Sequence, residues 1–154
     1  MIPEFNQLDD AEMELVLKAP VLVCILIAGA DGDIDRKEIN EALTVIKKQM
    51  QGQTALSGLF GVMAEDFEDK IKILMQNYPY DSTQRNPLLV EELSKLGLIW
   101  IKLDRTFSLT YYEMLKTLAE KIASSSGGLW GISTVASEEA RYLGLPMIPN
   151  PSKN

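Results

Sequence analysis

Residues 19–30 are almost purely apolar, and this run is the feature that most constrains the fold of the chain. A membrane-spanning helix needs about 20 such residues, so a shorter run predicts a helix that other elements bury on all sides. Val, Ile and Thr do not alternate with polar residues over any long stretch, and strands are therefore not expected. We predict an all-α fold, a single compact domain of about six to seven helices.

The composition excludes several classes of function. The chain has 154 residues and a formal net charge of -7, and it contains no histidine. An acidic surface disfavours nucleic-acid binding, and the absence of histidine removes imidazole as a catalytic base or metal ligand. Met1–Phe5 has no charged-then-apolar leader pattern, and we expect a cytoplasmic protein with no membrane or nucleic-acid partner.

No group stands out as catalytic. Cys24, the single cysteine, lies inside the apolar run, which predicts a core position in a protein from a reducing compartment. Ser124–Ser126 and the glycine-rich residues 127–131 are typical of a helix end. Neither a histidine nor a P-loop lysine accompanies them, so they do not indicate a nucleophile or a phosphate loop. We therefore predict that the protein is not an enzyme.

Helical periodicity places most of the elements. A first helix is expected from about Asp9 to Ala30, with a break or kink at Pro20. A second helix starts at Asp35, where Glu38 three residues later completes a capping box. A third apolar stripe and two further helices follow: Met63, Phe67, Ile71, Leu74 and Met75, then Leu88–Leu103 and Ser108–Ser124.

Proline and glycine mark the connections. Gly52–Gly61 is loop-like, and Tyr78–Pro87 is expected to be a connector because its prolines bracket turn-forming residues. A short last helix is expected to start near Ser137. Residues 1–145 form the predicted domain, and residues 146–154, which contain three prolines, form a flexible C-terminal tail.

The turn between the first two helices is rich in carboxylates: Asp31, Asp33 and Asp35, followed by Glu38. Hard cations such as Ca²⁺ and Mg²⁺ bind several oxygen ligands, which makes this turn a candidate site for a divalent cation. It is not an EF-hand loop, because Arg36 stands where that loop has its glycine. The alternative is a structural turn whose side chains only cap the next helix.

Residues 103–108 echo residues 30–35. In both segments an apolar stretch ends in Asp, an apolar residue follows three positions later, and a capping residue comes next. If the two corners meet in space, Asp104 adds a fourth carboxylate to the candidate metal site. The helix dipole disfavours a carboxylate at a helix C-terminus, and such a placement would favour a functional role. The alternative is that Asp31 and Asp104 begin their turns and bond the turn amides.

The segment Ala28–Asp35, with Glu38 three residues later, resembles the signature of the TerB-like (tellurite-resistance protein B) family. Residues 123–129 and 135–139 are similar to the C-terminal segment of that family. The resemblance implies an all-helical domain with two pseudo-symmetric halves, found in soluble bacterial proteins linked to tellurite and chemical stress. It also implies metal binding by the acids of residues 31–35, with Glu38 as a cap or further ligand.

We therefore expect a non-catalytic stress-response or sensing module related to tellurite resistance, with Ca²⁺ or Mg²⁺ at the turn 31–38. The second half departs from the family pattern, since Asp104 is followed by the neutral residues Thr106 and Ser108. The alternative is a protein-interaction scaffold in which the turn is purely structural. In that case an unidentified partner protein docks on an acidic or Met-rich face.

Overall fold

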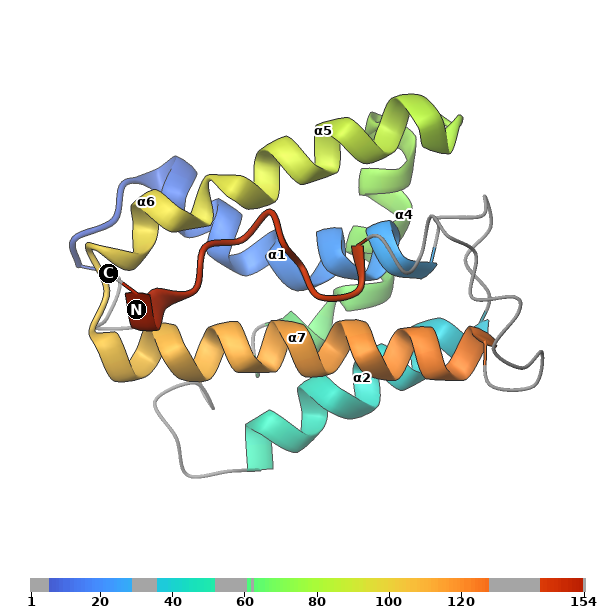
Figure 1. Cartoon of the computed structure of the whole chain (residues 1–154). Helices are drawn as coiled ribbons and strands as arrows, with labels where there is room; N and C mark the ends of the chain where they lie inside the picture. Colours follow the sequence, from blue (N-terminus) through green and yellow to red (C-terminus); the bar gives the residue numbers. More distant parts are fainter. Residues whose placement is uncertain (1–5, 29–35, 52–60, 62, 128–141, 154) are drawn as a thin grey trace.

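The chain folds as an assembly of helices (Figure 1). The computed structural model describes residues 6–28, 36–51, 61, 63–127 and 142–153. Its helices are α1 (Asp10–Ala28), α2 (Arg36–Gln51), α4 (Phe67–Asn77), α5 (Ser82–Ser94), α6 (Leu96–Trp100) and α7 (Arg105–Gly127), followed by the 3₁₀ helix η3 (Pro151–Lys153). No strand occurs among these described residues, and the prediction of an all-α domain is confirmed.

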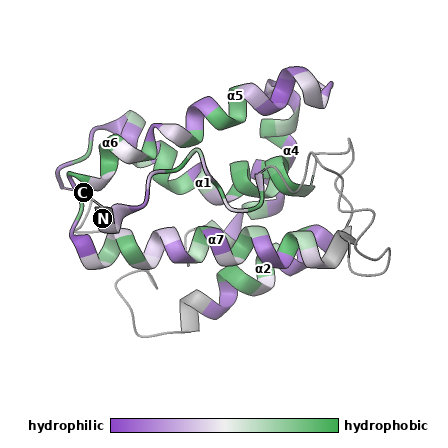
Figure 2. Cartoon of the chain, viewed as in Figure 1, coloured by the Kyte–Doolittle hydropathy of each residue, from purple (hydrophilic) through white to green (hydrophobic). Residues whose placement is uncertain are grey.

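Helix α1 is the centre of the fold. It packs against α2, α4, α5, α6 and α7. In Figure 1, α5 and α6 run along one side of α1, and α7 lies on the other side with α2 beyond it. Every residue from Ala19 to Ala28 is buried, and Figure 2 shows this helix as largely hydrophobic. The apolar run is therefore the helix surrounded by others that the sequence predicted.

A capping box begins α1. Asp9 accepts a hydrogen bond at Oδ1 from the backbone N–H of Glu12 (2.8 Å), and Glu12 accepts one at Oε1 from the backbone N–H of Asp9 (3.0 Å). This reciprocal pair satisfies amides that the first turn of a helix leaves unbonded. The capping box predicted at Asp35 lies outside the described residues.

Pro20 sits inside α1 without ending the helix. Proline has no N–H, so the carbonyl of Val16, four residues earlier, loses its helical partner. The buried hydroxyl of Tyr111 on α7 donates to that carbonyl (2.5 Å). Burial also raises the pKa of Tyr111 well above its ordinary value. A polar bond thus fixes α1 against α7 at the point where the proline interrupts the helical ladder.

The middle of the chain differs in part from the prediction. The third apolar stripe is confirmed, since Met63, Phe67 and Ile71 are buried. The connector expected over Tyr78–Pro87 is shorter, because α5 already begins at Ser82. The reason is the N-cap Asp81, whose Oδ1 accepts from the backbone N–H of Thr83 (2.9 Å). Pro87 then lies inside α5, and the single helix predicted over 88–103 is instead divided into α5 and α6.

The C-terminal segment also differs from the flexible tail that its prolines suggested. Leu145, Ile148 and Pro151 are buried, and η3 contacts α7. The indole N–H of Trp100 donates to the Pro149 carbonyl (2.7 Å). Leu145, just before Pro146, and Ile148, just before Pro149, give the segment enough apolar surface to dock, and prolines leave few backbone donors to satisfy. The last helix predicted near Ser137 starts outside the described residues.

Candidate functional site

Only part of the acidic turn lies within the described residues. Asp31, Asp33 and Asp35 lie outside the described residues, whereas Glu38 in the first turn of α2 is 3% exposed. Its negative charge acts on Cys24: burial first, and Glu38 second, raises the pKa of that thiol to about 12. A thiol with such a pKa is not a nucleophile at neutral pH, which agrees with the predicted core role of Cys24.

Asp104 is the N-cap of α7. Its Oδ2 accepts from the backbone N–H of Phe107 (3.2 Å), and its carbonyl accepts from the backbone N–H of Ser108 (2.9 Å). The placement of Asp104 at a helix C-terminus was therefore wrong, because α6 ends at Trp100 and the side chain belongs to the helix that follows. The helix dipole favours a carboxylate at this end. Across the part of the chain that the structure describes, no group of three or more His, Cys, Asp or Glu residues could hold a metal ion.

Helix α6 presents two large apolar side chains to solvent. Leu98 is 70% exposed and Ile101, directly after the helix, is 77% exposed. Residues three apart are neighbours on a helix surface, so these side chains form one short strip, here called the α6 ridge. The surface is hollowed on each side of this ridge: Leu98 lines one hollow and Ile101 lines another.

The first hollow lies between α1, α5 and α6 and is called the α1–α6 hollow. It has a volume of about 230 Å³. Buried Leu15 and Ile99 contribute apolar surface to it, and Leu98 of the ridge borders it. Its remaining lining residues are mostly charged: Asp9, Glu12, Glu92 and Lys95, together with Ala11. The hollow therefore combines an apolar base with more carboxylates than ammonium groups.

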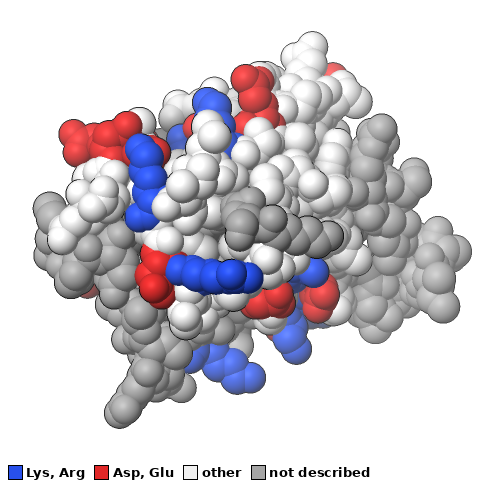
Figure 3. All heavy atoms as spheres, turned by 60° about the vertical axis from the view of Figure 1, so that its left-hand side comes forward, with Lys and Arg blue, Asp and Glu red and all other residues white. Residues whose placement is uncertain are grey.

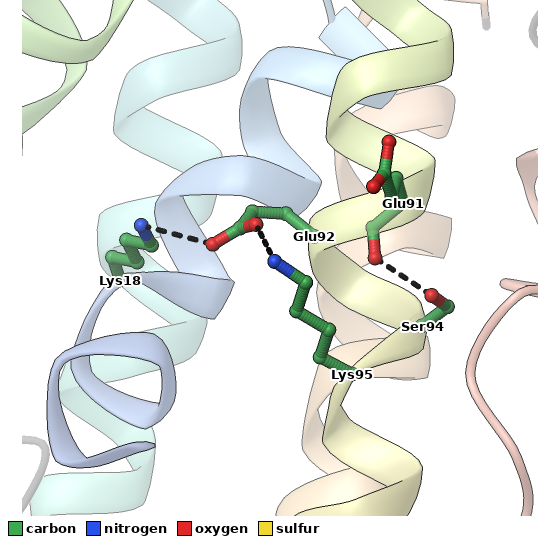
Figure 4. Close-up of polar contacts among 5 residues, drawn as sticks. All are labelled: Lys18, Glu91, Glu92, Ser94 and Lys95. Atoms are coloured by element: carbon green, nitrogen blue, oxygen red, sulfur yellow. Dashed lines mark hydrogen bonds and ion pairs between the residues drawn. The ribbon is translucent and has the colours of Figure 1, made fainter. Parts of the chain in front are cut away.

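Glu92 on α5 links the helices around this hollow (Figure 4). One of its oxygens pairs with Lys18 on α1 (3.3 Å) and the other with Lys95 (2.9 Å). The hydrogen bond from Lys95, and then the charge of Lys18, hold the pKa of Glu92 below its ordinary value. Beside it, the hydroxyl of Ser94 donates to the Glu91 carbonyl (2.6 Å). The carboxylate of Glu92 thus tethers α1 to α5.

Glu12 makes the corresponding link at the other end of the hollow. It pairs with Lys102, which follows α6, at 2.9 Å. The backbone hydrogen bond from Asp9, and then the contact with Lys102, lower the pKa of Glu12. Acidic and basic side chains lie close together on the face that carries these helix ends, with uncharged surface between them (Figure 3).

The second hollow, the α6–α7 hollow, is less charged. It has a volume of about 250 Å³ and is lined by Trp100, Ile101, Leu103, Arg105, Ser108 and Pro151. Arg105 is the charged residue among these, and its guanidinium donates to the Ser152 carbonyl (3.1 Å). The C-terminal segment therefore forms part of the wall of this hollow and holds its one charged side chain.

Sequence reasoning missed the α6 ridge, although a signal was present. Residues 96–103 are apolar at almost every position, and one helix cannot turn all of them to the same core. Some of these side chains therefore had to be exposed to solvent or packed against another segment of the chain. Which ones are exposed depends on the break before α6, and the periodicity did not reveal that break.

Comparison of the chain with protein-family models, with curated proteins and with solved structures finds no match. The helices of the described residues place the chain in the class of all-α domains. None of the helices in the described ranges combines the length and the apolar character that a membrane span requires.

Proposed function

We propose that this protein is a non-catalytic protein-interaction module that holds a partner on the α6 ridge and the α1–α6 hollow. The observation that carries the proposal is the pair Leu98 and Ile101, exposed side by side next to a hollow with an apolar base. Apolar anchors beside pockets are the usual centre of a protein interface, and charged residues form its rim. The alternative drawn from the sequence, a docking scaffold, is the class of function that this surface supports.

The chemistry of the chain supports a non-catalytic role. It has no histidine, and its single thiol, Cys24, is buried with a pKa of about 12. The carboxylates around the α1–α6 hollow are bonded to lysines and to a backbone amide, which suits positioning and binding more than proton transfer.

Photo-crosslinking in cells tests the proposal. A benzophenone amino acid at Leu98 should give a discrete crosslinked protein, and Ile101→Asp in the same chain should abolish it because the ridge becomes charged. The same probe at Lys121, an exposed position on α7, serves as the control. Equal crosslinking from Leu98 and Lys121, or no effect of Ile101→Asp, would contradict the proposal.

A second candidate function concerns the acidic turn, and it is supported by the spacing of four carboxylates, Asp31, Asp33, Asp35 and Glu38, within eight residues. Ca²⁺ and Mg²⁺ bind several oxygen ligands, and closely spaced carboxylates on a turn can provide them. Glu38 lies 3% exposed directly after Asp31, Asp33 and Asp35. We propose, as the resemblance to the TerB-like family implies, that a stress-sensing role related to tellurite resistance uses Ca²⁺ or Mg²⁺ at residues 31–38.

Calorimetry on metal-stripped protein tests the second proposal. Titration with Ca²⁺, Mg²⁺, Mn²⁺ and Zn²⁺ should show saturable binding to one of them, and the protein should be stabilised as the ligand concentration rises. The double change Asp31→Asn and Asp33→Asn should remove both effects. Unchanged affinity in that variant would show that the turn is structural.

A further inference from the structure

The charges around the α1–α6 hollow indicate which kind of partner it attracts. This inference rests on the docking role proposed above. Three of its lining side chains are carboxylates, Asp9, Glu12 and Glu92, and one is an ammonium, Lys95. More carboxylates are exposed on the same helices, namely Asp10, Glu14 and Glu91. Together with the net charge of -7, this arrangement attracts a cationic group and repels phosphate or an acidic peptide.

Two of the three lysines on these carboxylates are replaceable, whereas the third, Lys18, is only 21% exposed and pairs with the other oxygen of Glu92. The side chains of Lys95 and Lys102 are 54% and 43% exposed, and each makes one short contact to its glutamate. Exposed lysine pairs stabilise a fold only weakly, because the ammonium is well hydrated and the side chain is flexible. A guanidinium binds a carboxylate with two parallel hydrogen bonds, so an arginine from a partner can displace either lysine.

The spacing of the ridge indicates the shape of the partner. Leu98 and Ile101 lie three residues apart on a helical segment, which is the spacing that interdigitates with another helix. The described residues have no sheet edge to which an extended strand could be added. An apolar cavity of about 150 Å³ holds a benzene molecule, so the hollow of about 230 Å³ has room for one long side chain.

We infer that the α6 ridge and the α1–α6 hollow bind a basic amphipathic helix. Its apolar residues pack on Leu98 and Ile101, and an arginine on its flank enters the hollow between Glu12 and Glu92, whose negative charges both attract it. The apolar contact supplies most of the affinity. The arginine supplies the preference for a basic partner over a neutral or acidic one.

A synthetic peptide pair tests this inference on the full chain. The first is an amphipathic peptide of roughly 18 residues with leucines at helical spacing and arginines on both flanks of the apolar stripe, and the second carries glutamate at every arginine position. Calorimetry should show the arginine peptide binding at least about tenfold more tightly, and its affinity should fall as salt is added.

Matched variants locate the effect. Glu12→Gln and Glu92→Gln should each weaken the arginine peptide by about five- to tenfold, since each removes one carboxylate of the hollow. Gln at position 12 still fits a capping box, so α1 keeps its N-terminal cap. Glu120→Gln removes a carboxylate from the exposed face of α7 and should leave the affinity unchanged.

The other results overturn the inference in distinguishable ways. Equal binding of both peptides, weakened by Leu98→Ser, would leave the ridge as a docking surface and exclude a basic partner as its preferred ligand. Arginine-peptide binding that falls equally in all three glutamine variants would be attraction to the net charge and not to the hollow. If neither peptide binds, no basic helix docks here, and the crosslinking result at Leu98 decides separately whether the ridge has a partner.

Discussion

At the scale of single residues, capping side chains determine where the helices begin. Asp9, Asp81 and Asp104 each accept a hydrogen bond from an amide in the first turn of the next helix. Asp104 was a candidate metal ligand in the sequence, and in the structure it is a cap. The sequence does not distinguish the two roles, because an N-cap and a metal ligand both require a short side chain with an oxygen that can accept or coordinate.

Removal of the Asp104 cap should destabilise the protein. Asp104→Ala leaves the amide of Phe107 without its carboxylate acceptor, and we expect a loss of about 0.5–2 kcal/mol in the free energy of unfolding. Urea denaturation measures it. Asp104→Asn keeps an acceptor and should cost less, and addition of Ca²⁺ should not change the difference between wild type and Asp104→Ala. A difference that depends on Ca²⁺ would instead show that Asp104 is a cation ligand.

Acid should destabilise the protein through carboxylates whose pKa values folding lowers. Hydrogen bonds from Thr83 hold the pKa of Asp81 below its ordinary value, and the pKa values of Glu12 and Glu92 are also lowered. As pH falls below about 4.5, the unfolded chain takes up protons that the folded chain does not, so the free energy of unfolding falls. This stabilisation is fully present at neutral pH and is lost as pH drops through the lowered pKa values.

Thermal unfolding between neutral pH and about pH 3 measures this effect. Glu92→Gln should show a smaller loss of stability in acid than wild type, because its side chain no longer titrates. Glu120→Gln on α7 is the matched control. An identical acid dependence in wild type and Glu92→Gln would show that the lysine contacts of Glu92 are too weak to contribute.

At the scale of elements, α1 and α7 depend on each other through Pro20. The proline frees the carbonyl of Val16, and the hydroxyl of Tyr111 binds it. Tyr111 also packs against Trp100, with ring centroids 6.0 Å apart, and against Phe107, at 6.4 Å. The break predicted at Pro20 does not occur, since α1 continues through the proline, and a side chain from another helix bonds the carbonyl that lost its partner.

A double-mutant cycle tests this coupling. Tyr111→Phe removes the donor and leaves the Val16 carbonyl buried without a partner, which should cost about 1–3 kcal/mol. Pro20→Ala supplies a backbone N–H that can bond the same carbonyl, so Tyr111→Phe should cost less in that background. A coupling of about 0.5–3 kcal/mol is expected from urea denaturation of the four proteins. Strictly additive losses would contradict it.

At the scale of the whole molecule, the C-terminal segment completes the core. Leu145 and Ile148 are buried with the helices, and Pro149 lies against Gly97, where a Cβ atom would be only 2.7 Å from the proline Cγ. The glycine in α6 is needed for this approach of the tail. The segment also forms one wall of the α6–α7 hollow through Pro151.

Truncation after Gly144 should therefore destabilise the fold. Burial of Leu145 and Ile148 is worth about 1.5–3 kcal/mol each, so the shortened chain should lose about 3–6 kcal/mol. That is a large part of the stability of an ordinary domain, about 5–15 kcal/mol. Denaturant unfolding measures the loss, and a chain ending at Ser152 is the control. Equal stability of both chains would show that the tail only rests on the surface.

Much of the fold could be predicted because it depends on residues close together in the chain. The periodicity of α1 and of the stripe Met63, Phe67 and Ile71 was sufficient to predict their burial. The candidate site could be predicted less well. Leu98 and Ile101 have the same apolar character as their buried neighbours, and nothing local distinguishes an uncovered position from a covered one.

The sequence by itself determined that this chain is helical, that α1 is central and that Cys24 belongs to the core, because each follows from side chains within a few helical turns. The tertiary structure decided the rest. The bond from Tyr111 to Val16 joins residues 95 apart, and the bond from Trp100 to Pro149 joins residues 49 apart. Contacts at such separations decide which faces are covered. They therefore decided that the tail docks and that the α6 ridge remains exposed.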